Sequence, residues 1–355
     1  MRPSQMAHAF TLPIREYLAT FEENMQTFIG TDMELAADIL RKGGLVAIPT
    51  ETVYGLAANA LDEEAVLRIY EAKDRPRFNP LILHVPSIEA CESLVEEIPE
   101  PCRRLAARFS PGPLTYLLPK SERVPDLVTA GHRRVAIRIP SHPMALRLLE
   151  TVGFPLAAPS ANPSGYVSPV TAKHVMDGLG GRIPYILDGG PCEVGLESTI
   201  IGFENGRIVL FRQGAVSMEE IEKVSGMPVA LSEASVVAQT PGMLKSHYAP
   251  HAPLTLGDVD SLPATHTEER VAVITFHRRI PIGGSVAWSH VLSPSGDLHE
   301  AARNLFRILR EVDAEKPDRV IAEKVPDEGI GRAVNDRLER ARSEWRKGFY
   351  QGSGS

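Results

Sequence analysis

Two cationic side chains stand close together in the segment Lys73-Asp74-Arg75-Pro76. Pro76 restricts Arg75 to extended backbone, and in an extended chain the side chains at positions i and i+2 point the same way. We therefore expect Lys73 and Arg75 to share a face on a short, rigid segment. Two cations in this arrangement suit a polyphosphate or a pair of carboxylates, although a solvated basic loop carries the same pattern.

A second segment carries neutral hydrogen-bonding groups between prolines. Pro159 and Pro163 favour an extended track, which places the Ser160 hydroxyl and the Asn162 amide on one side of the chain. A hydroxyl and an amide can hold a ligand without fixing its charge. The same pattern also occurs in ordinary turns, so the segment indicates a binding loop only together with other signals.

Four polar side chains lie in or directly after apolar runs. Thr50 and Thr52 follow the run 45–48, at the kind of strand end where α/β sheets gather ligands. His84 interrupts another apolar run, where a satisfied core histidine and a ligand contact are both open. Arg138 needs an anionic partner, because a buried guanidinium without one is costly, and that partner is either a ligand or a core carboxylate.

Three more polar side chains lie further along the chain. Ser198 and Arg212 flank late apolar runs and add a hydroxyl and a cation. Tyr248 follows Lys245 and His247 in a segment rich in turn residues. There it either folds over a ligand or simply connects two domains.

Local signals predict the elements that position these side chains. Residues 31–34 form a capping box for a helix that two glycines end, Asp62 is a helix N-cap, and residues 217–220 form a second capping box. Helices and strands alternate in places while late strands cluster, so we expect an α/β domain with a mixed, twisted sheet and flanking helices. Further helices are expected near residues 102–109, 143–151 and 171–179, and strands at 45–48, 80–85, 114–118, 134–139, 155–158, 184–188, 198–203 and 208–212.

A smaller domain follows. Apolar strands are expected at residues 271–276, 286–292 and 319–325, and the amphipathic helix of residues 297–312 lies between the last two. This order predicts a small open α/β, Rossmann-like domain. The predicted division is an N-terminal extension (1–30), a catalytic domain (31–226), an interdomain linker (227–252), a C-terminal domain (253–350) and a flexible tail (351–355).

Composition limits the class of protein. A length of 355 residues fits two domains, and a net charge of −7 argues against a protein that coats nucleic acid. Cys91, Cys102 and Cys192 form no C-x-x-C pair, so we expect neither a disulfide framework nor a structural zinc site. The longest uncharged run, residues 151–172, contains several prolines and cannot span a membrane. No Walker A, G-x-G-x-x-G, H-E-x-x-H or G-x-S-x-G motif occurs, and we expect a cytoplasmic protein.

Several short motifs occur together in one order along residues 31–350. They are P-T-E-T-V-Y-G-L at 49–56, K-x-R at 73–75 with N-P-L at 79–81, P-G-P-L-T at 111–115, S-x-N at 160–162, E-S-T-I at 197–200 and H-Y-A-P at 247–250. Each motif is weak alone. Their joint pattern resembles the threonylcarbamoyl-adenylate synthases, the YrdC-like proteins, in their longer two-domain form, which implies a YrdC-like fold for the first domain.

The resemblance implies an enzyme that joins L-threonine, bicarbonate and ATP, accompanied by Mg²⁺, into threonylcarbamoyl-AMP and pyrophosphate. The product would be handed to the tRNA threonylcarbamoyl-transferase complex. Family members hold threonine at the positions that match Thr52, His84, Arg138, Ser198 and the backbone of Ala158. They hold ATP at the positions that match Lys73, Arg75, Asn79, Arg134, Ser160, Asn162, Ser168, Arg212 and Tyr248, and Lys73, Arg75, Ser160 and Asn162 are the expected catalytic residues.

Two other classes of protein stay open. Hydrogenase-maturation carbamoyltransferases contain the same fold and use carbamoyl phosphate, although three unpaired cysteines do not supply their zinc fingers. A double-stranded RNA-binding or regulatory YrdC-like module without turnover is the second class, because the fold presents a basic concave surface. A weak contact with RNA is compatible with this reading and would depend steeply on salt.

Overall fold

Two sheets frame the protein. The computed structural model describes residues 26–232, 248–257, 259 and 269–342. Within these residues the first sheet has eleven strands and the second has four. The first-sheet strands are β1 (Phe28–Gly30), β2 (Val46–Ile48), β3 (Gly55–Asn59), β4 (Ile82–His84), β5 (Leu114–Pro119), β6 (Arg134–Arg138), β7 (Leu156–Ala157), β8 (Tyr185–Leu187), β9 (Thr199–Glu204), β10 (Arg207–Arg212) and β11 (Val229–Leu231).

Mixed strand pairing characterises the first sheet, whose order is β1-β8-β2-β3-β7-β4-β6-β5-β9-β10-β11. The sheet contains antiparallel pairs, such as β2 with β3 and β5 with β6, and parallel pairs, such as β4 with β6 and β5 with β9. This confirms the predicted α/β class with a mixed sheet. Its helices are α2 (Met33–Arg41), α3 (Glu63–Ala72), α4 (Ile88–Cys91), α5 (Glu100–Phe109), α6 (Asp126–Thr129), α7 (Pro143–Val152), α8 (Ala172–Leu179) and α9 (Met218–Ser225).

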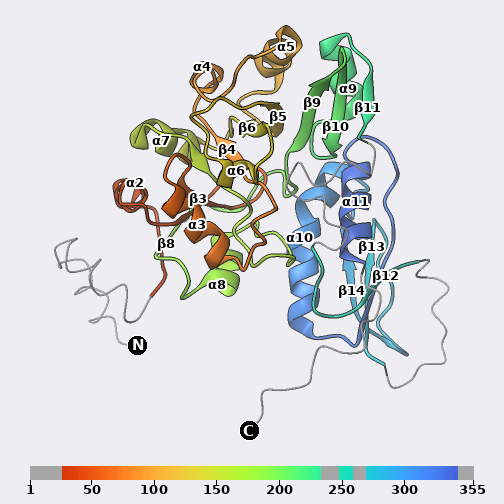
Figure 1. The fold of residues 1–355 in the computed structure, drawn as a ribbon. Coiled ribbons are helices and arrows are strands. Elements are labelled where there is room, and N and C mark those ends of the chain that lie inside the picture. The colour runs from red at the N-terminus through yellow and green to blue at the C-terminus, as the bar shows by residue number, and fades with distance from the viewer. Residues whose placement is uncertain (1–25, 233–247, 258, 260–268, 343–355) are drawn as a thin grey trace.

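The smaller domain has an all-parallel sheet of order β12-β15-β13-β14. Its strands are β12 (Leu254–Leu256), β13 (Val271–Thr275), β14 (Val286–Val291) and β15 (Arg319–Ala322), and its helices are α10 (Leu298–Glu315) and α11 (Gly331–Ala341). Figure 1 shows α10 between this sheet and the first domain, with α11 beside it. One hydrophobic core cluster includes residues of both domains, so the two domains pack together.

Local capping decides where several helices begin. The Asp62 side chain accepts hydrogen bonds from two amides of the first turn of α3, and Ser217 forms both bonds of a capping box at α9, as predicted. Helix α2 differs from the prediction by one residue. Its N-cap is Asp32 and not Thr31, because the Asp32 carboxylate accepts from the Leu35 amide.

Two short edge strands lie outside the predicted bounds of the first domain, and the central strand β3 was not among the predicted strands. Strand β1 comes from the segment expected to be an N-terminal extension, and β11 comes from the start of the expected linker. Each strand has three residues and is held by parallel pairing, β1 to β8 and β11 to β10. Their place in the fold therefore depends on distant strands more than on local sequence. No helix in the described part of the chain is long and apolar enough to cross a membrane.

Candidate active site

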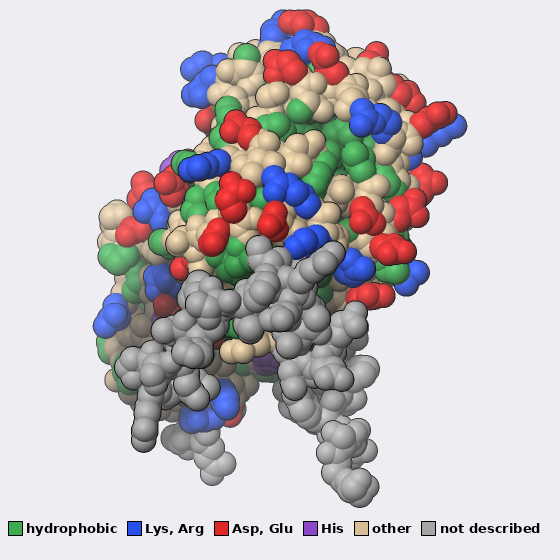
Figure 2. Space-filling view, turned by 90° about the vertical axis from the view of Figure 1, so that its left-hand side faces the viewer, with side chains coloured by type: hydrophobic (Ala, Val, Ile, Leu, Met, Phe, Trp, Pro, Cys, Tyr) green, Lys and Arg blue, Asp and Glu red, His purple; other side chains and the backbone are tan. Residues whose placement is uncertain are grey.

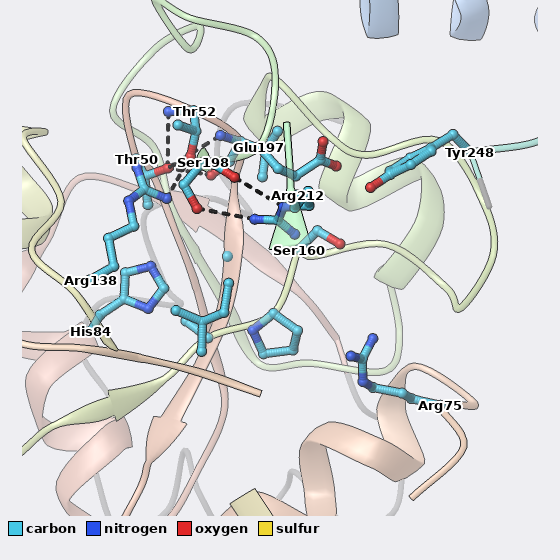
Figure 3. Close-up of a pocket in the computed structure, with 15 residues that line it drawn as sticks. Thr50, Thr52, Arg75, His84, Arg138, Ser160, Glu197, Ser198, Arg212 and Tyr248 are labelled. Carbon is cyan, nitrogen blue, oxygen red and sulfur yellow. Dashed lines mark hydrogen bonds between the residues drawn. The ribbon is translucent and has the colours of Figure 1, made fainter. Parts of the chain in front are cut away.

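One pocket gathers most of the polar residues that the sequence singled out. It lies beside the ends of β2, β4 and β6 and the segment after β7, and Figure 3 shows the residues that line it. The predicted site residues that line it are Thr52, Arg75, His84, Arg138, Ala158, Ser160, Ser198, Arg212 and Tyr248, and they are joined by Thr50, Val53, Gly55, Ile82, Pro159 and Glu197. In Figure 3, Arg138 and His84 lie at one end of this pocket and Arg75 and Tyr248 at the other.

The end that contains Arg138 is organised by strand register. Strands β4 and β6 are parallel neighbours, and His84 is paired with Arg138 in that register. Arg138 donates a hydrogen bond of 2.8 Å to the Thr52 hydroxyl and one of 3.3 Å to the Gly112 carbonyl. The side chain is 5% exposed, so its charge is held almost entirely inside the protein.

Glu51 supplies the countercharge for Arg138. Its Oε1 lies 2.7 Å from Arg138 Nη2, and its Oε2 accepts a hydrogen bond from the Ser141 amide. The short contact lacks hydrogen-bond alignment, and neither Arg138 Nη2 nor Glu51 Oε1 has another hydrogen-bond partner among the described residues. Arg138 therefore fits both interpretations of the sequence, because it has a core carboxylate partner and also lines the pocket.

His84 is a neutral donor or acceptor at the same end. Burial, together with the nearby Arg138 charge, lowers its pKa to about 3. Its Nδ1 has no hydrogen-bond partner in the described part of the protein. An unpaired, buried imidazole nitrogen beside a pocket is a group that a ligand can satisfy.

Arg212 lies between the two ends. Its Nε donates to the Ser198 carbonyl and its Nη2 to the Ser198 hydroxyl, both at 3.0 Å, as Figure 3 shows. Ser198 in turn shares a 2.7 Å hydrogen bond with Thr115, which orients the hydroxyl. Burial lowers the pKa of Arg212 to about 10, and the group stays charged at neutral pH.

The end that contains Arg75 carries an excess of positive charge. Arg75 donates to the carbonyls of Asn79 and Pro80, at 3.1 and 2.8 Å, and no carboxylate pairs with it within the residues that the structure covers. Burial lowers its pKa to about 10, which still leaves a charged guanidinium. Tyr248 closes this end with a ring that is 1% exposed. A buried cation with only carbonyl partners favours an anionic ligand.

Comparison with known proteins identifies the family. Residues 38–214 match the family model described as Telomere recombination, which covers Sua5, YciO and YrdC proteins, and residues 216–343 match the model of the threonylcarbamoyl-AMP synthase C-terminal domain. The chain is 45% identical to the threonylcarbamoyl-AMP synthase of Pyrococcus abyssi, with 87% of this chain and 93% of that protein covered. It is 42% identical to the enzyme of that name from Bacillus subtilis, with 86% and 91% covered.

The chain belongs to the two-domain threonylcarbamoyl-AMP synthases. The crystal structure of Pyrococcus abyssi Sua5 complexed with L-threonine agrees, with a TM-score of 0.80 at 42% identity over 89% of this chain and 97% of that one. The resemblance seen in the sequence motifs is thereby confirmed for both domains.

Some residues that the family resemblance singled out lie behind the pocket wall. Lys73 is fully buried and donates to the carbonyls of Ser160 and Asn162. The Asn162 amide donates to the carbonyls of Pro163 and Tyr166. Lys73 and Asn162 thus shape the loop that presents Ser160 to the pocket.

The expected extended segment around Lys73 is absent. Lys73 caps the end of α3 in helical conformation, and Asp74 has a left-handed φ of 52°. The chain turns sharply there, so Lys73 and Arg75 do not share a face as they would in an extended strand. Lys73 points to the loop carbonyls, and Arg75 points into the pocket.

Three other predicted residues take different places. The Asn79 carbonyl accepts from Arg75, while its buried side-chain nitrogen has no partner among the described residues. Ser168 donates a 2.6 Å hydrogen bond to Glu197. Arg134 lies at the opposite end of β6 from Arg138, roughly 13 Å along the strand, where it forms a 2.5 Å ion pair with Glu204.

Sequence reasoning missed three charged residues at this site. Glu51 and Glu197 stand inside the motifs P-T-E-T and E-S-T-I, so their positions next to the selected hydroxyls were a usable signal. Arg337, which contacts Glu197, had no such signal, because it lies in α11 of the other domain.

Proposed function

We propose that this protein joins L-threonine, bicarbonate and ATP into threonylcarbamoyl-AMP and pyrophosphate, as a nucleotidyltransferase. The observation that carries the proposal is one pocket with a buried arginine at each end, Arg138 and Arg75, in a chain of this family. Two anionic reactants, an amino acid and a nucleotide, can then meet between them. The product would pass to the tRNA threonylcarbamoyl-transferase complex in the cytoplasm.

Threonine would occupy the Arg138 end. The Arg138 guanidinium, which lines this end, suits a carboxylate, because a guanidinium matches carboxylate geometry. The Thr52 and Ser198 hydroxyls and the neutral His84 ring supply polar contacts for the threonine hydroxyl and amine, and Ala158 lines the wall. The relative from Pyrococcus abyssi, solved with L-threonine, supports threonine as a ligand.

ATP would occupy the Arg75 end. Arg75 and Arg212 would face its phosphates, and Ser160 and Tyr248 would contact the nucleotide. Lys73, Asn79, Asn162 and Ser168 would act from behind by holding the loops in place. Arg134 is left out of the proposed site because its ion pair with Glu204 lies at the far end of β6.

The reaction brings two anions together. The threonine amine first combines with bicarbonate, with loss of water, to give threonine carbamate. An oxygen of this carbamate attacks the α-phosphorus of ATP, the bond from that phosphorus to the bridging oxygen breaks, and pyrophosphate leaves. Fixed arginines lower the repulsion without forming a covalent bond. Glu51 and Glu197 are both paired with arginines, so we assign Mg²⁺ to the phosphate oxygens, where it would add positive charge.

Pyrophosphate release from ATP by the purified protein tests the proposal. We expect release that requires Mg²⁺, L-threonine and bicarbonate together, and only background release when L-serine replaces L-threonine. Release with carbamoyl phosphate alone would instead support the carbamoyltransferase class. Salt-sensitive binding of double-stranded RNA with no release under any condition would contradict the proposal and support a binding module.

A further inference from the structure

A helix of the C-terminal domain reaches the wall of the pocket. Arg337, in α11, is 0% exposed and is the largest fully buried side chain of the described residues. Its Nε lies 3.0 Å from Glu197 Oε2, and its Nη2 donates to the Gln213 carbonyl at 2.9 Å. These two partners belong to the first domain, so this guanidinium bonds across the domain boundary, while its Nη1 pairs with Asp336 of its own helix at 2.7 Å.

Arg337 also contacts the residue that closes the pocket. Its guanidinium lies 5.5 Å from the centre of the Tyr248 ring, and Phe306 of α10 stacks on that ring at 5.3 Å. Tyr248 therefore contacts both α10 and α11 of the C-terminal domain. The same guanidinium thus contacts two pocket-lining residues, Glu197 and Tyr248.

Glu197 would disfavour nucleotide binding if its charge were unpaired. It lines the pocket in which Arg75 and Arg212 offer positive charge. An uncompensated carboxylate there would repel phosphates and would draw Arg212 toward itself. Burial acts to raise the pKa of Glu197, but the charges of Arg337 and Arg212 and the Ser168 hydrogen bond hold it below its ordinary value, so the group is ionised.

We propose that Arg337 is a positioning residue for ATP, which neutralises and orients Glu197 and fixes Tyr248, so that the C-terminal domain sets the affinity of the nucleotide end. This inference rests on the proposed function for the identity of the ligand. The second domain would then contribute a positioning residue to the active site.

Docking of the two domains is the competing explanation, and the chain offers a matched control for it. Arg332 lies on the same helix and forms a 2.5 Å ion pair with Glu219 of the first domain. This pair also crosses the domain boundary, but neither residue lines the pocket. A change at Arg332 therefore weakens docking and leaves the charge of the pocket as it is.

The test compares Arg337→Met with Arg332→Met in the full chain. We measure ATP binding by calorimetry, and the KM values for ATP and for L-threonine by pyrophosphate release. For Arg337→Met we expect the Kd and KM for ATP to rise about tenfold or more, because one partner of a buried pair is left uncompensated, with the threonine KM changed less than twofold. Arg337→Lys keeps the charge, so its Kd and KM for ATP should lie between those of the unaltered protein and those of Arg337→Met. Arg332→Met should change neither KM.

A second, compensating substitution distinguishes a loss of ATP positioning from a loss of folded protein. The double variant Arg337→Met/Glu197→Gln removes both charges, so we expect ATP affinity to return to within a few-fold of the starting protein. It also provides a folded test protein if Arg337→Met alone unfolds, which thermal unfolding reports. An unchanged ATP Kd in Arg337→Met, or no rescue in a folded double variant, would overturn the inference. If the unaltered protein neither binds ATP nor releases pyrophosphate, the proposed function fails first, and the inference fails with it.

Discussion

Two buried pairs of arginine and glutamate border the pocket, and they are arranged in opposite ways. At the proposed threonine end, Arg138 lines the pocket and Glu51 lies behind it, with 2.7 Å between Nη2 and Oε1. At the proposed nucleotide end, Glu197 lines the pocket and Arg337 lies behind it, at 3.0 Å. The first pair presents a cation to the ligand, and the second presents a carboxylate whose charge is compensated.

The two pairs also differ in which domains they need. Arg138 and Glu51 both belong to the first domain, where the register of β6 and the turn after β2 bring them together. Glu197 and Arg337 meet only when α11 packs against the first domain. The threonine end is thus complete once the first domain folds, while the nucleotide end requires both domains. A chain built in this way can couple domain packing to nucleotide binding without a change at the amino-acid end.

Loss of Arg138 should have the largest effect. In Arg138→Ala we expect the KM for L-threonine to rise about a hundredfold or more, and the free energy of unfolding to fall by roughly 3 kcal/mol, because Glu51 is left buried without its partner. Threonine titration calorimetry and denaturant unfolding measure the two effects.

The double variant Arg138→Ala/Glu51→Gln separates them. It removes the orphaned charge, so it should regain much of the stability but none of the threonine affinity. Normal threonine binding in Arg138→Ala would contradict this prediction, because Arg138 and Glu51 would then form only a core ion pair.

Local signals were enough to predict much of the fold. Asp62 and Ser217 cap helices within three residues of themselves, so a short window of sequence contains the whole interaction. The start of α2 was misplaced because Thr31 and Asp32 are both good caps, and only the backbone decides between them. Strand β1 gave no signal, since its three residues are paired with residues more than 150 positions away, as in the pair of Phe28 with Tyr185.

The residues of the candidate site also differ in how far the sequence could predict them. Motif order was enough to name the residues that the structure brings into one pocket, such as Arg75, Arg138 and Ser198. The left-handed φ of Asp74 reversed the expected relation between Lys73 and Arg75, because one residue outside the extended region redirects every side chain after it. Arg337 could not be predicted, since its partner Glu197 is 140 residues away and a single arginine on an amphipathic helix reads as a solvated one.

Arg75→Ala tests the nucleotide end, and its expected effect is smaller than that of Arg138→Ala. Its hydrogen-bond partners are two carbonyls and not a carboxylate, so no buried charge is orphaned when it is removed. We expect the ATP KM to rise by about ten- to a hundredfold with a fall in unfolding free energy of roughly 1 kcal/mol. Initial-rate kinetics and denaturant unfolding measure both.

Lys73→Met is the matched comparison for Arg75→Ala. Lys73 lies behind the wall and holds the loop carbonyls of Ser160 and Asn162, so its loss should alter the Michaelis constants of both substrates and lower stability. An ATP-specific defect in Lys73→Met with full stability would place Lys73 directly on the nucleotide, against the geometry seen here.

The smallest expected effect is the change in stability with pH that His84 causes. It tests whether His84 stays neutral at the threonine end of the folded protein. The folded pKa of His84 is about 3 while the unfolded value is near 6.5, so below pH 6.5 the unfolded chain takes up a proton that the folded chain does not. Stability is therefore full above pH 6.5 and is lost as the pH falls toward the folded pKa. Between pH 7.5 and 5.5 this one group should remove on the order of 1 kcal/mol of unfolding free energy.

Denaturant unfolding at the two pH values measures this loss, and His84→Asn should show a pH-dependent loss smaller by that amount. His174→Asn is the control for threonine binding, because His174 also has a lowered pKa, of about 4, but lies outside the pocket. It should also reduce the pH-dependent loss of stability, and it should leave the pH profile of the threonine Kd unchanged. Threonine affinity of the unaltered protein should stay constant over this range, since the imidazole is neutral throughout. A threonine Kd that changes with a midpoint near pH 6.5, and loses that midpoint in His84→Asn, would show that His84 titrates in the folded protein and that the charge at this end is not fixed by Arg138 alone.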